Sequence, residues 1–210
     1  MATFTVPNQR FAVCTFSVVE SIGLSRWRGG TGVGRTETAS AIWRVELSTP
    51  ALTDAQRAEW RAWKAKLRGG LDLFSLYDAK QATPQAYPTA TASTDISGSW
   101  NGTASVTSVG ASGSLGLSGL PSTYVATAGD YVALEQSSKI GFYQITTGGT
   151  ATAGALTVTV RPFLHSGLFT TSATARLWQP KATFALEAGS WSDTGGIDPS
   201  PISFSGIQVI

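Results

Sequence analysis

Residues 43–69 read WRVELSTPALTDAQRAEWRAWKAKLRG, and this stretch changes from the pattern of a strand to that of a helix. Trp43, Val45 and Leu47 alternate with charged residues, which is the two-residue period of a half-buried β-strand. Thr53 and Gln56 have the spacing of a capping box, so a helix is expected to begin beside them. The stretch therefore predicts a strand that is followed almost directly by a helix.

The predicted helix covers residues 54–68. Trp60, Trp63 and Leu67 recur at helical spacing, and we expect this stripe to pack the helix against the rest of the domain. Cations fill its last turn and Gly69 supplies a C-terminal stop. A basic helix is also a candidate for nucleic-acid binding. A solvated basic face is the better interpretation, because the opposite side of the helix is built from alanine and tryptophan.

Both ends of the chain carry strand signals. Thr3–Val6 and Ile202–Ile210 have few of the charges and prolines that guard edge strands, so both are expected to be edges that pair with other copies. In the second segment, Ile207 falls on the opposite parity from Phe204. A bulge at Gly206 is therefore expected, because it would return the apolar side chains to one face.

Charge divides the chain into two parts. Between Pro88 and Val160 the only lysine or arginine is Lys139, and this region is rich in glycine, serine and threonine. We interpret residues 87–173 as an inserted β-rich domain. Residues 1–86 and 174–210 would then pair with each other as one discontinuous domain. The predicted fold class is mainly β, a β-sandwich with one α-helix.

The composition excludes several classes of protein. The chain has 210 residues and a net charge of only +2, so its total charge does not require nucleic acid or an anionic membrane as a partner. Cys14 is the only cysteine, which rules out an intramolecular disulfide. The N-terminus has no secretory signal pattern, and no apolar stretch approaches the roughly 18 residues that cross a bilayer. We expect a protein that is made in a cytoplasm and does not insert into membranes.

No constellation of residues predicts catalysis. His165 is the only histidine, and no nucleophile-elbow motif accompanies it. Carboxylate pairs such as Asp193 with Asp198 lack the aromatic and polar residues that line a sugar cleft. With one histidine and one cysteine, no ligand spacing supports a zinc site. The sequence predicts no catalytic residue, no cofactor and no metal.

A glycine-rich segment contains Gly29, Gly30, Gly32 and Gly34. It lacks the Gly-Lys-Ser/Thr ending of a phosphate-binding loop, and no helix follows it. We interpret it as a connection between two strands that contacts a neighbouring subunit in an assembly.

Several segments resemble the distal tail protein family of siphophages. Residues 43–53, 58–63 and 67–69 match its pattern of a strand with a Leu-Thr cap, followed by a Trp-containing helix that ends in Leu-Arg-Gly. Further similarity covers the strand after the helix, the inserted β domain and the returning strand, at residues 71–78, 128–132, 157–164 and 202–205.

This resemblance implies a β-sandwich related to tail-tube proteins, with one helix and an inserted small β-barrel-like domain. It implies a structural virion protein at the tail tip, assembled in the host cytoplasm. Its copies would form a six-membered ring that joins the tail tube protein to the central hub or baseplate protein. The tape measure protein would be a further partner, and DNA would pass through the lumen only in transit.

Three other functions remain open from the sequence. The chain would also suit a glycan-binding β-sandwich module if Trp100, Tyr124 or Tyr143 were exposed and stacked on sugar rings, although core packing is the better interpretation of each. A tail-tube or tail-terminator subunit is a close neighbour of the distal tail protein and has almost the same sequence pattern. A hydrolase would have to depend on His165.

Overall fold

The structure is a computed structural model that describes residues 1–7, 10–26, 33–110, 112–164, 167–194 and 199–210. It is mainly β with one α-helix, as predicted. The sheet strands are β1 (Thr3–Thr5), β2 (Val13–Arg26), β3 (Val33–Ser48), β4 (Leu73–Tyr77), β13 (Lys181–Leu186), β14 (Ser192–Asp193) and β15 (Ile202–Gln208). The barrel strands are β5 (Thr103–Val109), β6 (Ser114–Ser118), β8 (Tyr131–Gln136), β9 (Lys139–Thr147), β11 (Leu156–Arg161) and β12 (Thr174–Arg176).

Five further elements complete the described chain. They are helix α1 (Asp54–Lys66), the short helices η1 (Arg68–Gly70) and η2 (Ser93–Asp95), and a two-stranded sheet of β7 (Val125–Ala126) and β10 (Gly149–Thr150). None of the helices in the described ranges is long and apolar enough to cross a membrane.

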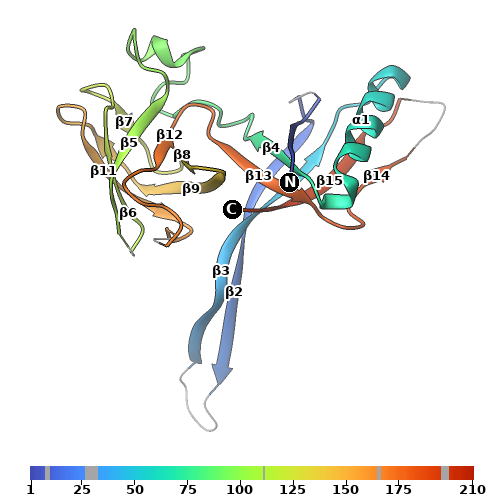
Figure 1. Cartoon of the computed structure of the whole chain (residues 1–210), viewed down its shortest axis with the longest axis horizontal. Coiled ribbons are helices and arrows are strands. Elements are labelled where there is room, and N and C mark those ends of the chain that lie inside the picture. The colour runs from blue at the N-terminus through green and yellow to red at the C-terminus, as the bar shows by residue number, and fades with distance from the viewer. Residues whose placement is uncertain (8–9, 27–32, 111, 165–166, 195–198) are drawn as a thin grey trace.

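The first unit is a seven-stranded sheet in the order β1-β4-β13-β15-β3-β2, with β14 added beside β15. The C-terminal strands β13 and β15 lie side by side in its centre, between N-terminal strands on both sides. Thus β13 pairs with β4, and β15 pairs with β3, so the N-terminal and C-terminal segments share one hydrogen-bonded layer. Figure 1 shows the β2–β3 hairpin projecting from this sheet as a long arm.

The second unit is a closed barrel in the order β11-β6-β5-β12-β8-β9. Five of its strands lie within residues 87–173, but β12 begins at Thr174. The sixth barrel strand therefore comes from the segment that the sequence assigned to the flanking domain. The reason is that β12 must pair with both β5 and β8 to close the barrel, and pairing at this distance leaves no local sequence signal.

Helix α1 begins and ends almost where the sequence predicts. Thr53 is its N-cap: its hydroxyl accepts from the Gln56 amide at 3.5 Å, and its own amide donates to Gln56 Oε1 at 3.0 Å. The helix ends at Lys66, two residues before the predicted end, because Leu67 is already the C-cap and Gly69 takes a left-handed φ of 71°. Trp60, Trp63 and Leu67 are all buried against the sheet.

Strand β15 contradicts two expectations. It lies in the middle of the sheet, between β13 and β3, and is not an edge. Its register with β3 runs without a shift, so no bulge occurs at Gly206. A central strand meets side chains on both faces, so the half-buried Ile207 has no need to return to the Phe204 face. Gly206 instead leaves room for an aromatic ring, since a Cβ there would lie 2.7 Å from Phe74.

The barrel is packed against the sheet through a shared aromatic core. Tyr131 and Phe142 point outward from the barrel strands β8 and β9 and join the core of the sheet. Both form edge-to-face pairs with Trp43, at centroid distances of 5.7 Å and 5.3 Å. The Trp43 indole also donates to the Phe142 carbonyl at 2.7 Å. One face of the sheet is thus covered by α1 and by the barrel wall.

The opposite face of the sheet, here called the open face, is polar. Thr15, Ser17 and Glu46 are exposed on it, and Arg44 is half-buried. Arg44 pairs with Glu187 at 3.0 Å and with Glu46 at 3.4 Å, and Glu187 accepts a hydrogen bond from the Ser205 hydroxyl at 2.5 Å. Hydrogen bonding to Ser205 and Arg44 holds the pKa of Glu187 below its usual range. The one cation at the centre of this face is therefore paired with two carboxylates.

Candidate assembly surface

The base of the projecting hairpin is held firmly. Phe16 and Val18 on β2 lie opposite Val45 and Trp43 on β3, on the face that packs against the barrel. Phe16 contacts Phe142 and Phe184 at centroid distances of 5.6 Å and 5.8 Å. The hairpin is therefore rooted in the shared core, and its direction is set by the fold.

Beyond this root the hairpin leaves the core. We call residues 19–26 and 33–42 the arm. Four large apolar side chains on it are exposed: Val19 at 44%, Ile22 at 53%, Leu24 at 68% and Val33 at 49%. A two-stranded ribbon without further packing is only marginally stable in water. Exposed apolar side chains gathered on one element indicate a contact surface.

The register shifts between Val19 and Ile22 decide which side chains share a face of the arm. Past these shifts Ile22 lies opposite Glu37, and Leu24 lies opposite Arg35. Because directly paired residues project to the same side, one face of the arm combines apolar groups with charges. The other face carries small and hydroxyl side chains, including Ser21, whose hydroxyl bonds that of Thr38 at 2.6 Å. Bulges also increase the local twist of the ribbon.

A cleft of about 470 Å³ separates the arm from the corner of the barrel after β11. Ile22 and Glu37 line it from the arm, and Phe163 lines it from the barrel. Phe163 is 40% exposed, and the Arg161 guanidinium lies over its ring at 3.6 Å. The cleft therefore has an apolar floor with charges of both signs around it, which suits a protein partner better than a small neutral ligand.

The two edges of the sheet differ. β1 has only three residues, and the indole of Trp63 donates to the outer carbonyl of Thr5 at 2.9 Å. That edge is short and partly covered. β2 runs for 14 residues, contains no proline and carries charge only at Glu20 and Arg26. A long edge strand with so few charges and no proline can form backbone hydrogen bonds with a strand of another chain.

The glycine segment can be placed only in part. Gly29, Gly30 and Gly32 lie outside the described residues. Gly34 lies in β3, opposite Ser25 on the arm. Its position connects the predicted segment with the arm, the part of the described chain that has the most exposed apolar surface.

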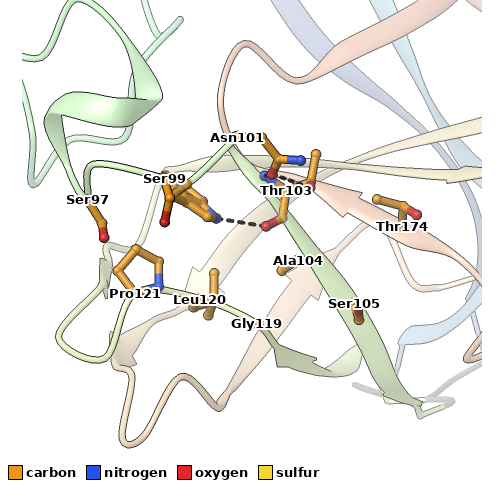
Figure 2. Close-up of a pocket in the computed structure, with 11 residues that line it drawn as sticks. Ser97, Ser99, Asn101, Thr103, Ala104, Ser105, Gly119, Leu120, Pro121 and Thr174 are labelled. Carbon is orange, nitrogen blue, oxygen red and sulfur yellow. Dashed lines mark hydrogen bonds between the residues drawn. The ribbon is translucent and has the colours of Figure 1, made fainter.

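The three aromatic residues considered for glycan stacking are buried. Trp100 is 6% exposed, and Tyr124 and Tyr143 are each 1% exposed, inside the barrel core. Core packing, the favoured interpretation of each, is confirmed, and glycan stacking by these three is excluded, because the interior of a small closed barrel has to be filled by large side chains. Beside Trp100 lies a hollow of about 480 Å³ lined mainly by serine, threonine and asparagine (Figure 2). The Trp100 indole is already engaged there, donating to the Thr103 carbonyl at 2.7 Å.

Groups with possible chemistry are few in the described ranges. His165 and Asp198 lie outside them, so the site of a histidine-dependent hydrolase is not among the residues that can be placed. Asp193 forms ion pairs with Arg57 and Arg61, which tie α1 to β14. Burial raises the pKa of the Cys14 thiol to about 11, with Asp78 adding to the effect. Within the placed residues no group of three potential ligands gathers around a metal position.

The arm was missed as a functional element, although a signal for it was present. Cys14, Phe16 and Val18 alternate with polar residues, and Ile22 and Leu24 resume the same alternation after an interruption at Val19 and Glu20. The pattern thus runs for longer than the typical strand of about 5–6 residues. The length of the strand, more than its composition, was the signal for the arm.

Neither the family models nor the curated proteins with which the sequence was compared match this chain.

Proposed function

We propose that this chain is a structural subunit of a phage tail: a distal tail adaptor whose copies form a six-membered ring between the tail tube and the central hub. One observation carries the proposal. The sheet has two free edges, and from one of them an arm with exposed apolar side chains projects on a rigid root. Head-to-tail contacts between different surfaces close into a ring when the rotation is right, and a ring leaves no arm unpartnered.

The open face of the sheet supports the same proposal. In a ring it would be the surface available to line the lumen, because α1 and the barrel occupy the other face. Its exposed hydroxyl groups, and an Arg44 that is already paired with two carboxylates, give passing DNA no strong cationic site to bind. The barrel would then stand on the outer side, where it meets other tail-tip proteins.

Native mass spectrometry and electron microscopy of the purified chain test the proposal. We expect discrete rings of six copies of the 21.9 kDa subunit. The triple variant Val19→Ser, Ile22→Ser, Leu24→Ser should remain folded but lose the ring, because the apolar contact of the arm is removed. A matched control replaces Leu71, which is 62% exposed but lies off the arm, with serine. A chain that stays monomeric at high concentration contradicts the proposal.

The same experiment separates the adaptor from its near relatives. A tail-tube subunit would stack its rings into long tubes, whereas an adaptor that meets a different protein on each side would stop at single or paired rings. Tubes of unlimited length would therefore identify the chain as a tail-tube subunit and contradict its assignment as an adaptor.

A further inference from the structure

The part of the arm next to its root is acidic. Residues 19–22 and 37–42 contain Glu20 and Glu37 and no lysine or arginine. Both carboxylates are exposed, and neither forms an ion pair with any side chain that the structure places. Val19 and Ile22 are exposed beside them. This surface thus offers two carboxylates without an ion-pair partner and two apolar groups, and Arg35 and Arg161 line the same cleft as the carboxylates.

A basic corner lies at the other side of the sheet, where β4 and β13 lead to the barrel (Figure 1). Lys181 pairs in register with Tyr77, and Lys80 follows three residues later along the chain. Neither lysine forms an ion pair within the described ranges. The neighbouring Asp78 is 7% exposed, so the surface of this corner presents mainly the two cations.

The register of the sheet places these two surfaces toward the same end of the two outer strands. A continuous row of paired residues crosses from β4 to β2 through Leu73, Ala185, Ile207, Arg44 and Ser17. Four residues farther along each outer strand stand Tyr77 on β4 and Ser21 on β2. The two strands run in the same direction, since β4 and β2 are separated by an even number of antiparallel steps. The acidic root and the basic corner therefore lie toward the same end of their strands, on opposite sides of one subunit.

We infer that the arm of one copy docks against the basic corner of the next copy, with Glu20 and Glu37 facing Lys80 and Lys181. This inference rests on the proposed ring, because a rotation about the ring axis carries one side of the sheet in one copy to a position beside the other side in the next copy. The contact also covers Val19 and Ile22. Charge complementarity of this kind selects the partner and fixes the register of the interface.

Charge reversal tests the pairing, because the two halves of the contact can be reversed separately. One variant carries Glu20→Lys and Glu37→Lys, so that its arm and its corner are both positive. The other carries Lys80→Glu and Lys181→Glu, so that both are negative. Each alone should need at least roughly tenfold more protein to assemble than the unmodified chain. Mixed in equal amounts, the two should form rings in which they alternate, at close to the unmodified affinity.

Two controls keep the test specific. Glu59→Lys and Lys66→Glu reverse exposed charges on α1, outside the contact, and should leave assembly unchanged. Circular dichroism of each variant shows whether the subunit is still folded before mixing. Rings from the unmodified chain, with both reversed variants assembling normally or their mixture failing to assemble, would overturn the inference and leave the proposed function standing. An unmodified chain that forms no ring overturns both.

Discussion

The barrel and the seven-stranded sheet meet the edge problem of β-structure in opposite ways. Pairing of β9 with β11 closes the barrel, and closure removes the edges. The sheet keeps β1 and β2 as free edges and extends β2 into the arm. Among the described residues, Phe163 is the one large exposed apolar side chain of the barrel, and the others lie on the flanking segments. A closed unit can be complete as a monomer, whereas the sheet has surface left over for other chains.

The largest effect is expected from a substitution in the core that the barrel and the sheet share. Trp43→Ala removes a buried indole from the shared core and leaves the Phe142 carbonyl without its donor. We expect a loss of about 3–5 kcal/mol in the free energy of unfolding, measured by chemical denaturation. Leu24→Ala, at an exposed position on the arm, should change it by less than about 0.5 kcal/mol. Equal effects of the two variants would mean that the barrel and the sheet do not share a core.

A second variant tests how α1 is held against the seven-stranded sheet. Arg57 and Asp193 are 7% and 12% exposed and lie 3.2 Å apart, and Arg57 also donates to Ser200. Asp193→Ala leaves a buried guanidinium without its counter-charge, which should cost about 3 kcal/mol. Glu59→Ala on the outer face of α1 is the control, with a change below about 0.5 kcal/mol. A small effect at Asp193 would show that aromatic packing alone holds the helix.

The sequence predicted local elements well and long-range placement poorly. The capping box of Thr53 and Gln56 is complete within four residues, so α1 was found almost to the residue. Whether a strand is central or at an edge depends on partners far along the chain. β15 was therefore taken for an edge, and β12 was separated from the barrel that it closes. Alternation is the same at Phe16 and at Leu24, so it cannot show where the core ends and the arm begins.

The candidate site was predicted only in outline for the same reason. Trp100, Tyr124 and Tyr143 have the side chains of a sugar platform, but burial decides whether an aromatic ring is core or surface. All three lie in the barrel core, Tyr143 on β9 and the other two on connecting segments. Conversely, Ile22 and Leu24 have the sequence pattern of ordinary strand residues. They form a candidate contact surface only because no other element of the fold covers them.

A third prediction concerns the segment that joins the two units, and its effect should be smaller. Burial raises the pKa of Asp78 above its ordinary value of 3.8, against the opposing hydrogen bonds from the backbone of Lys80 and Gln81. The folded state therefore binds this proton more tightly than the unfolded state. Stability from this group is present at low pH and is lost as the pH rises through the raised pKa.

Asp78→Asn removes the buried charge and keeps the oxygen that accepts from the Lys80 amide at 2.9 Å. At pH 7 the variant should be slightly more stable than the unmodified chain in thermal unfolding. Its advantage should shrink as the pH falls toward 4. An advantage that is constant with pH would show that the Asp78 carboxylate does not titrate at this junction. Asp95→Asn is a useful comparison, because hydrogen bonds from the Ala92 and Thr91 amides hold the pKa of Asp95 below its usual range.

The smallest expected effects are the free energies of local opening, and hydrogen exchange measures them separately in the sheet and in the barrel. Backbone amides of the arm are bonded only to each other, so hydrogen exchange from residues 21–26 should proceed by local opening that costs at most about 1–2 kcal/mol. Amides of β8 and β9 lie in a closed barrel wall and should exchange only on global unfolding, typically at about 5–15 kcal/mol. When the chain is concentrated enough to assemble, protection should rise on the arm and stay constant in the barrel. If the arm of the dilute monomer were protected from exchange as strongly as the barrel, the arm would be stable without a partner. There would then be no physical reason to expect it to bind a neighbouring subunit.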